Sequence, residues 1–121
     1  MPRTGGRMKI EASQKGAYRL IRIEEPLKLI SDLSELKSLI EGYVERGDRY
    51  IAVNFSDASY LYSGAIAVLV NCYKLLRSRQ GDLCIVEPNK NLLELLTQMN
   101  IDSIMRVYHR ENDLPADPSD L

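Results

Sequence analysis

The 121-residue sequence is short of several features that mark particular classes of protein. Its formal net charge is −1, so no electrostatic argument favours binding to nucleic acid or to an acidic membrane surface. No apolar run approaches the ~20 residues that a helix needs to span a bilayer. The first seven residues contain no apolar core, so we expect no secretory signal and interpret residues 1–7 as a flexible lead-in.

Cysteine and histidine are scarce, which limits the chemistry that the chain can perform. Cys72 and Cys84 each lie in an apolar segment, at a spacing that does not match a metal-binding pair. Buried free thiols are therefore favoured over a disulfide, and they indicate a cytoplasmic location. His109 is the only histidine and has no companion for a catalytic triad. Since a Gly-rich phosphate loop is also missing, we expect no enzyme activity, no metal and no cofactor.

The beginning of the chain has the alternating pattern of β-strands. The alternating apolar residues are Met8, Ile10, Ala12, Tyr18 and Leu20. Gln14-Lys15-Gly16 supplies a turn between the two runs, and Pro26 ends the pattern because proline cannot donate to a strand ladder. Residues 8–24 therefore predict two strands in a hairpin.

Helical and strand patterns then alternate along the chain. Helices are predicted over 32–46, 64–79 and 92–99, and strands over 49–55, 82–86 and 104–108. Asp32 with Glu35 forms a capping box for the first helix, and Asn89 is placed to cap the third. The strand at 49–55 is apolar almost throughout, which is typical of a central strand with helices outside the sheet.

These elements predict a single α/β domain over residues 8–112. Its central sheet is mixed, because the opening hairpin is antiparallel while each strand–helix–strand unit implies a parallel pair with a right-handed crossover. The helices are expected to pack on this sheet. Residues 113–121 contain proline and acidic residues with little to bury, so we expect a flexible acidic tail.

One stretch, residues 50–69, joins a buried strand to a helix and carries the candidate site. Ser63 stands before Gly64 where the helix begins. A serine at this position is a good N-cap, stabilising a helix by roughly 1 kcal/mol. The free backbone amides of a helix start would equally welcome a phosphate on the same hydroxyl. The residues leave both roles open.

Taken in order, these features resemble the STAS domain, the family of anti-sigma factor antagonists and sulfate-transporter tails. The resemblance covers roughly 8–112. Besides the opening hairpin, it rests on the segments Ser56-Asp57-Ala58-Ser59-Tyr60-Leu61 leading into Tyr62-Ser63-Gly64, Leu83-Cys84-Ile85-Val86-Glu87-Pro88-Asn89, Leu92-Leu93-Glu94-Leu95-Leu96 and Asn100-Ile101-Asp102.

In the bacterial antagonists, the serine before the glycine of this turn is phosphorylated by a partner kinase that is also an anti-sigma factor. The resemblance therefore implies that Ser63, the one residue matching that acceptor, is a phosphorylation site and that an anti-sigma factor/serine kinase is the partner. The implied partner-binding residues are Asp57, Ser59, Tyr60, Leu61, Tyr62, Ser63, Gly64, Glu87 and Asn89.

The chain departs from the family pattern at the acidic residue two places before the serine. Leu61 stands there, and Asp57 lies too far upstream to replace it. One alternative is therefore a domain whose switch has decayed and which binds its partner constitutively. Another is a sensor for a nucleotide or small ligand between the two loops. A second copy of the chain, in a weak homodimer, is a further possible partner. Glu87 and Asn89 also fit a plain strand-to-helix turn, which is the preferred interpretation of that loop.

Overall fold

The computed structural model describes residues 10–23, 34–55 and 63–118, and for Ser34 and residues 63–65 it describes the backbone alone. In these residues five strands form one sheet: β1 (Ile10–Lys15), β2 (Tyr18–Ile23), β3 (Tyr50–Asn54), β4 (Asp82–Val86) and β5 (Val107–Tyr108). The helices are α1 (Ser34–Glu45), α2 (Ser63–Ser78) and α3 (Lys90–Gln98), and two 3₁₀ turns, η1 (Ile101–Ser103) and η2 (Glu111–Asp113), follow them.

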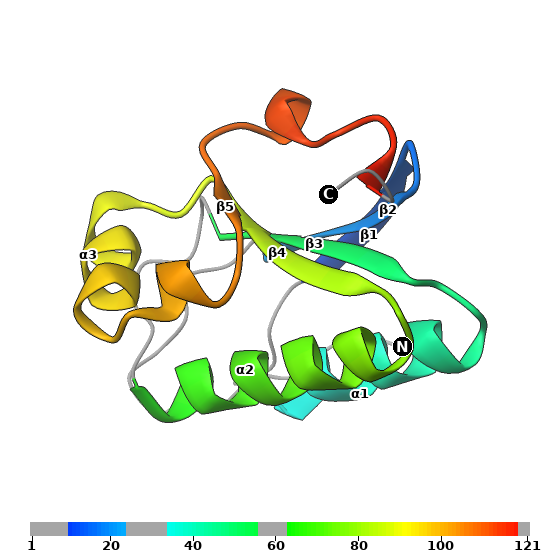
Figure 1. Ribbon diagram of the computed structural model, residues 1–121, viewed down its shortest axis with the longest axis horizontal. Coiled ribbons are helices and arrows are strands. Elements are labelled where there is room, and N and C mark those ends of the chain that lie inside the picture. Colours follow the sequence, from blue (N-terminus) through cyan, green and yellow to red (C-terminus); the bar gives the residue numbers. More distant parts are fainter. Residues whose placement is uncertain (1–9, 24–33, 56–62, 119–121) are drawn as a thin grey trace, which may run out of the picture.

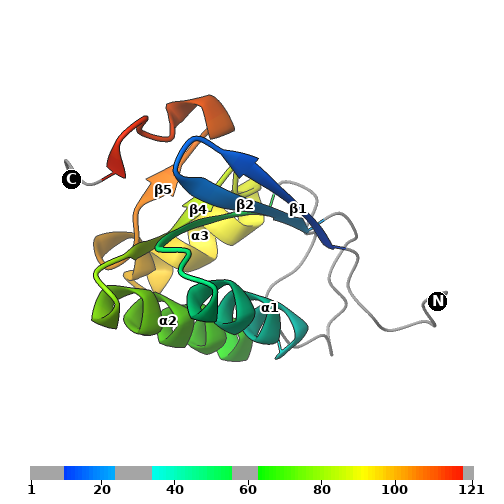
Figure 2. The same ribbon diagram turned by 90° about the vertical axis from the view of Figure 1, so that its right-hand side faces the viewer.

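The sheet is mixed, as the sequence predicts. β1 and β2 are antiparallel, while β2, β3, β4 and β5 run parallel to one another in chain order. A two-residue turn joins β1 to β2, and its first residue, Gly16, has the φ of +59° that a type II′ hairpin turn requires. Each parallel strand lies on the same side of the strand before it, in the order β2, β3, β4, β5. Right-handed crossovers therefore place all the crossover helices on one face of the sheet. Figures 1 and 2 show α1 and α2 side by side beneath the sheet.

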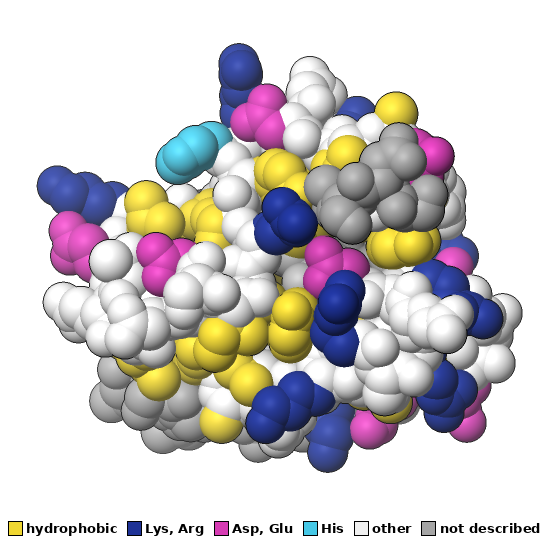
Figure 3. All heavy atoms as spheres, in the orientation of Figure 1, with side chains coloured by type: hydrophobic (Ala, Val, Ile, Leu, Met, Phe, Trp, Pro, Cys, Tyr) yellow, Lys and Arg dark blue, Asp and Glu magenta, His cyan; other side chains and the backbone are white. Residues whose placement is uncertain are grey.

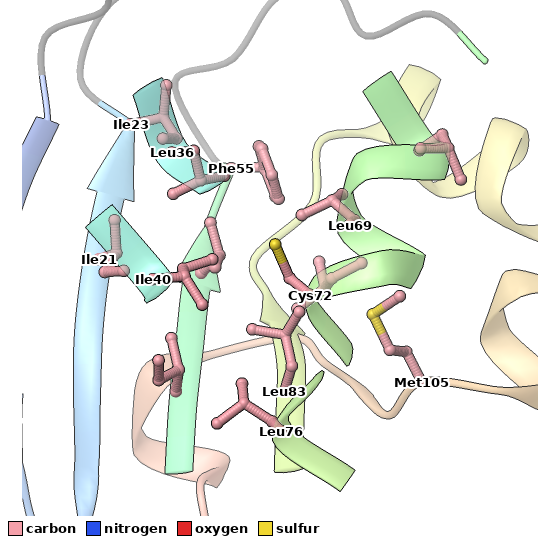
Figure 4. Close-up of a cluster of buried hydrophobic side chains, with 14 of the residues drawn as sticks. Ile21, Ile23, Leu36, Ile40, Phe55, Leu69, Cys72, Leu76, Leu83 and Met105 are labelled. Atoms are coloured by element: carbon pink, nitrogen blue, oxygen red, sulfur yellow. The ribbon is translucent and has the colours of Figure 1, made fainter. Parts of the chain in front are cut away.

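The main core lies between this helical layer and the sheet (Figure 4). From β3 and β4 it takes alternate side chains such as Ile51 and Leu83, as the strand period of two demands. From α2 it takes Ile66, Leu69, Cys72 and Leu76, all buried. Tyr73, four residues after Leu69 along the helix, is half-buried at the edge of the core, whereas the thiol of Cys72 lies inside the core.

The opposite face of the sheet, here called the open face, has a smaller apolar cluster. Its buried members are Tyr18, Leu20, Ala52, Cys84 and Val86. In the described residues no helix covers them, so the helices expected outside the sheet lie on one of its faces. The C-terminal segment crosses this face instead (Figure 1): Leu114 packs against the cluster and Pro118 is buried. The expectation that residues beyond 112 have little to bury is therefore wrong for these two side chains.

One predicted boundary also changes. The strand expected over 104–108 is reduced to Val107–Tyr108, because Ile104 closes η1 and the buried Met105 joins the main core. Gly81 follows the end of α2 at a place where a Cβ would collide with the carbonyl group of Arg49. The capping box at Asp32 lies outside the described residues.

Candidate functional site

Ser63 is the first residue of α2, so the helix start predicted at this point of the chain is confirmed, while the turn before it lies outside the described residues. β3 ends at Asn54 and the helix starts nine positions later. The first turn of α2 carries no acidic residue, and its backbone amides are the unpaired donors of a helix start. This end of α2 is therefore electrostatically suited to a negative charge. The residues Asp57, Ser59, Tyr60, Leu61 and Tyr62 lie outside the described residues, and Ser63 and Gly64 are described by their backbone alone.

The second predicted loop leaves the sheet at the same edge as the first. Asn54 and Val86 are partners in the β3–β4 register, so the chain continues from both strands at their shared carboxyl edge. The start of α2 and the turn after β4 both lie at the left end of the molecule in Figure 1. In an α/β sheet, this edge is where ligands and partners are usually bound.

Asn89 is an N-cap. Its backbone is extended, with φ −68° and ψ 170°, and its side-chain Oδ1 accepts a hydrogen bond from the Leu92 amide at 2.9 Å. This confirms the cap predicted from the sequence, which stabilises α3 by about 1 kcal/mol. The side chain of Asn89 is thus used within the chain, and its part in partner binding stays a prediction.

Glu87 has a left-handed backbone with φ +52°, a conformation that costs a non-glycine residue about 1 kcal/mol or more. Both carboxylate oxygens are held in place. Oε1 accepts a hydrogen bond from the Asn54 side chain at 3.2 Å, and Oε2 accepts one from the backbone amide of Glu111 at 3.2 Å. These contacts orient Glu87 toward the C-terminal segment.

Glu111 is the centre of a polar cluster that also contains Arg22, Asn54 and Glu87. Nothing in the local sequence pattern singles Glu111 out. Its carboxylate accepts two hydrogen bonds from the Arg22 guanidinium, at 2.8 and 2.7 Å, and one from the Asn54 side chain at 2.7 Å. Hydrogen bonds from Arg22 hold the pKa of Glu111 below its usual value. Asn54 is only 3 % exposed, and Arg22 also donates to Glu11 at 2.8 Å. The cluster fastens η2 to the carboxyl ends of β2 and β3.

One signal in the sequence points to this cluster. Asn54 ends a strand that is otherwise apolar, and a buried amide side chain needs hydrogen-bond partners. The partners themselves are 57 and 33 positions away along the chain, which no local pattern can show.

A groove of about 550 Å³ opens at the amino ends of β3 and β4, away from the start of α2. Its lining includes Tyr50, Arg77, Asp82 and Arg106. Burial raises the pKa of the Asp82 carboxyl, and the two guanidinium groups act in the opposite direction. On the face seen in Figure 3, acidic and basic side chains are interspersed. The ligand pocket hypothesised between the two loops involves residues outside the described ranges, and this groove lies elsewhere.

In the described residues no group of three or more His, Cys, Asp or Glu side chains could hold a metal ion. No helix in the same residues is both long and apolar enough to cross a membrane. Both cysteines are buried free thiols, as predicted.

Solved structures with the same fold include a candidate anti-sigma factor antagonist and the anti-sigma factor antagonist SpoIIAA. A candidate antagonist from Thermotoga maritima superposes with a TM-score of 0.71 at 21% identity, over 86% of this chain and 89% of that chain. The Bacillus cell fate determinant SpoIIAA, solved in its phosphorylated form, gives 0.63 at 15% identity, over 84% and 90% of the two chains. At these identities the likeness establishes the fold.

Sequence comparison establishes the family. A Thermotoga maritima protein described as a candidate anti-sigma factor antagonist is 28% identical over 72 residues, which are 60% of this chain. The match spans 64% of that relative, a little less than two thirds of its length. The family model of the STAS domain matches residues 9–114, which is most of the sequence and all of the sheet. The chain therefore belongs to the STAS domain family.

Proposed function

We propose that this protein is an anti-sigma factor antagonist: a cytoplasmic, non-catalytic binding module whose partner is an anti-sigma factor with serine kinase activity. Binding the anti-sigma factor releases the sigma factor, and phosphorylation of Ser63 switches that binding. The observation that carries the proposal is the position of Ser63 as the first residue of α2 in a STAS domain. The names of the relatives and the fold shared with SpoIIAA support it.

The switch follows from the chemistry of the helix start. A phosphate on Ser63 brings nearly two negative charges to the backbone amides of the first turn, which carries no competing carboxylate. Those amides hold the phosphate with little change in the fold. The surface offered to the partner by Tyr60, Leu61 and Tyr62 changes instead, so a domain without catalytic groups acts as a switch.

Intact-mass analysis after incubation with the cognate kinase and ATP tests the phosphorylation step. The wild-type protein should gain the mass of one phosphate. Ser63→Ala should stay folded, lose at most about 1 kcal/mol of capping and gain no phosphate. Ser78→Ala, at the exposed far end of α2, is the matched control and should be modified like the wild type. An unmodified wild-type chain, or a modified Ser63→Ala variant, contradicts the proposal.

A second candidate function rests on Leu61, which replaces the acidic residue of the family pattern. In this case the domain binds its partner constitutively, and the charge state of Ser63 is irrelevant. Pull-down of the partner with Ser63→Asp separates the two functions: reduced capture supports the switch, and unchanged capture supports the constitutive module. Leu61→Asp, which returns the acid, should speed phosphorylation only if the switch exists.

A further inference from the structure

The strand β1 forms one end of the sheet, and within the described residues no strand pairs with its outer side. Its pairing with β2 runs without interruption from Ile10–Ile23 to Lys15–Tyr18, so no bulge distorts it, and it contains no proline. Proteins usually protect such edges with bulges, proline or repelling charges. β1 has neither a bulge nor a proline, so its charged side chains decide which strand the edge can pair with.

The hairpin turn fixes which backbone groups face outward. In a two-residue hairpin, the residues flanking the turn, here Lys15 and Tyr18, exchange hydrogen bonds, and bonded and non-bonded pairs then alternate along the ladder. The peptide groups of Ile10, Ala12 and Gln14 therefore point away from β2. They are the groups that a further strand would bind.

A second copy of the chain can pair antiparallel with this edge in several registers. The register centred on Ala12 uses the outward groups of Ile10, Ala12 and Gln14 in each copy, and the register centred on Ser13 uses those of Ala12 and Gln14. In the register centred on Ser13, Ala12 of one copy exchanges hydrogen bonds with Gln14 of the other, and Glu11 faces Lys15 twice by symmetry. In the register centred on Ala12, Glu11 faces Ser13 and no ion pair forms. Opposite charges across strands stabilise a pairing, and non-bonded pairs bring side chains closest, so the charges select the register centred on Ser13.

The existing contacts of these two side chains leave room for a partner. Glu11 accepts a hydrogen bond from Arg22 through Oε1, and its side chain remains 51% exposed. Lys15 donates to the Asn112 side chain at 3.1 Å on the exposed surface and has two further N–H groups. Glu11 lies opposite Arg22 in the register, so both charged side chains of β1 project on the open face.

We propose that β1 is the interface of a homodimer, in which two copies pair antiparallel about Ser13 and form reciprocal Glu11–Lys15 ion pairs. The two sheets become one continuous sheet with the helices of both copies on the same face. An interface of one strand from each copy is small, so the dimer is weak. β1 contains none of the residues assigned to partner binding, and the proposal therefore stands independently of the proposed function.

Sedimentation velocity on the full chain, from about 10 µM to about 1 mM, measures the association directly. The wild type should dimerise reversibly over this range. Glu11→Lys and Lys15→Glu each place like charges opposite one another twice and should raise the dissociation constant about tenfold or more. The double variant E11K/K15E should return to within about threefold of the wild type. Glu94→Lys, with the same charge change on an exposed position of α3, is the control and should dimerise like the wild type.

The recovery in the double variant is decisive, because Glu11→Lys and the double variant both lose the Arg22 contact within the chain. A second variant tests the backbone: Ala12→Pro removes an outward N–H without breaking a bond to β2, so it should abolish dimerisation while circular dichroism stays unchanged. A wild type that remains monomeric, a double variant as weak as the single ones, or a folded Ala12→Pro protein that dimerises normally would overturn the proposal.

Discussion

Replacing Glu111 should loosen the C-terminal segment from the sheet. Its carboxylate receives two hydrogen bonds from Arg22 and one from Asn54. Hydrogen bonds to a charged group are each worth about 1.5–3 kcal/mol when buried. The Arg22 side chain is 39% exposed, however, and exposed ion pairs contribute only about 0–1 kcal/mol. Since Glu111 is 17% exposed and Asn54 is buried, we expect Glu111→Ala to lower the free energy of unfolding by about 2 kcal/mol.

The stabilisation by Glu111 should also depend on pH, in a direction that follows from its pKa. The pKa of Glu111 is lowered in the folded protein, chiefly by hydrogen bonds from Arg22. Its charged form therefore contributes stability that is fully present above the unfolded pKa, about 4.3, and is lost as the pH falls through the lower folded pKa. Glu111→Gln removes this contribution. The difference between wild type and Glu111→Gln should be constant above about pH 5 and should shrink below it.

Urea unfolding at pH 7 and at several acidic pH values measures both effects. Asp113→Ala is the matched control, because Asp113 is an acid in the same 3₁₀ turn whose ion pair with Arg110 is long, at 3.9 Å, and exposed. It should change stability by no more than about 0.5 kcal/mol. If Glu111→Ala is no more destabilising than Asp113→Ala, or if the Gln variant's deficit grows on acidification, the account of the polar cluster is wrong.

Three further predictions concern the fold around the site. Asn89→Ala should cost about 1 kcal/mol in chemical denaturation because it removes the cap of α3, and Asn89→Asp, which keeps the capping oxygen, should cost much less. Gly81→Ala should lower stability by about 3 kcal/mol or more in the same assay, since the new Cβ meets the backbone carbonyl of Arg49; a near-neutral result would refute that close approach. Burial raises the pKa of the Cys72 thiol to about 11 and that of Cys84 further, so Ellman's reagent at pH 8 should label neither in the native state and both after unfolding.

Local patterns in the sequence predicted the elements whose buried residues recur with a clear helical or strand period. The helical spacing of apolar residues such as Ile66, Leu69 and Leu76, all buried in the structure, predicts the helix over 64–79, and alternation predicts the opening hairpin. The same approach failed near residue 104, where a short apolar run fits a strand as well as a turn. There Met105 packs in the core from an irregular segment, and only two residues pair with β4.

The contacts that the sequence could not predict join segments far apart along the chain. A lone Leu114 after an acidic turn has no periodicity, yet it covers the open face because the one-directional order of the parallel strands leaves that face without a helix. Similarly, Glu111 accepts hydrogen bonds from Arg22, which lies 89 positions earlier in the chain. Of the candidate site, the start of α2 and the cap at Asn89 follow from local rules, whereas the anchoring of Glu87 depends on these distant partners.

The central claim is that phosphate on Ser63 controls partner binding. It is tested most directly by isothermal titration of the anti-sigma factor with purified Ser63-phosphorylated protein and with the unmodified protein. The account predicts that phosphorylation weakens binding at least tenfold, about 1.4 kcal/mol, with an unchanged circular dichroism spectrum. Equal affinity of the two forms would contradict it and leave a constitutive binding module.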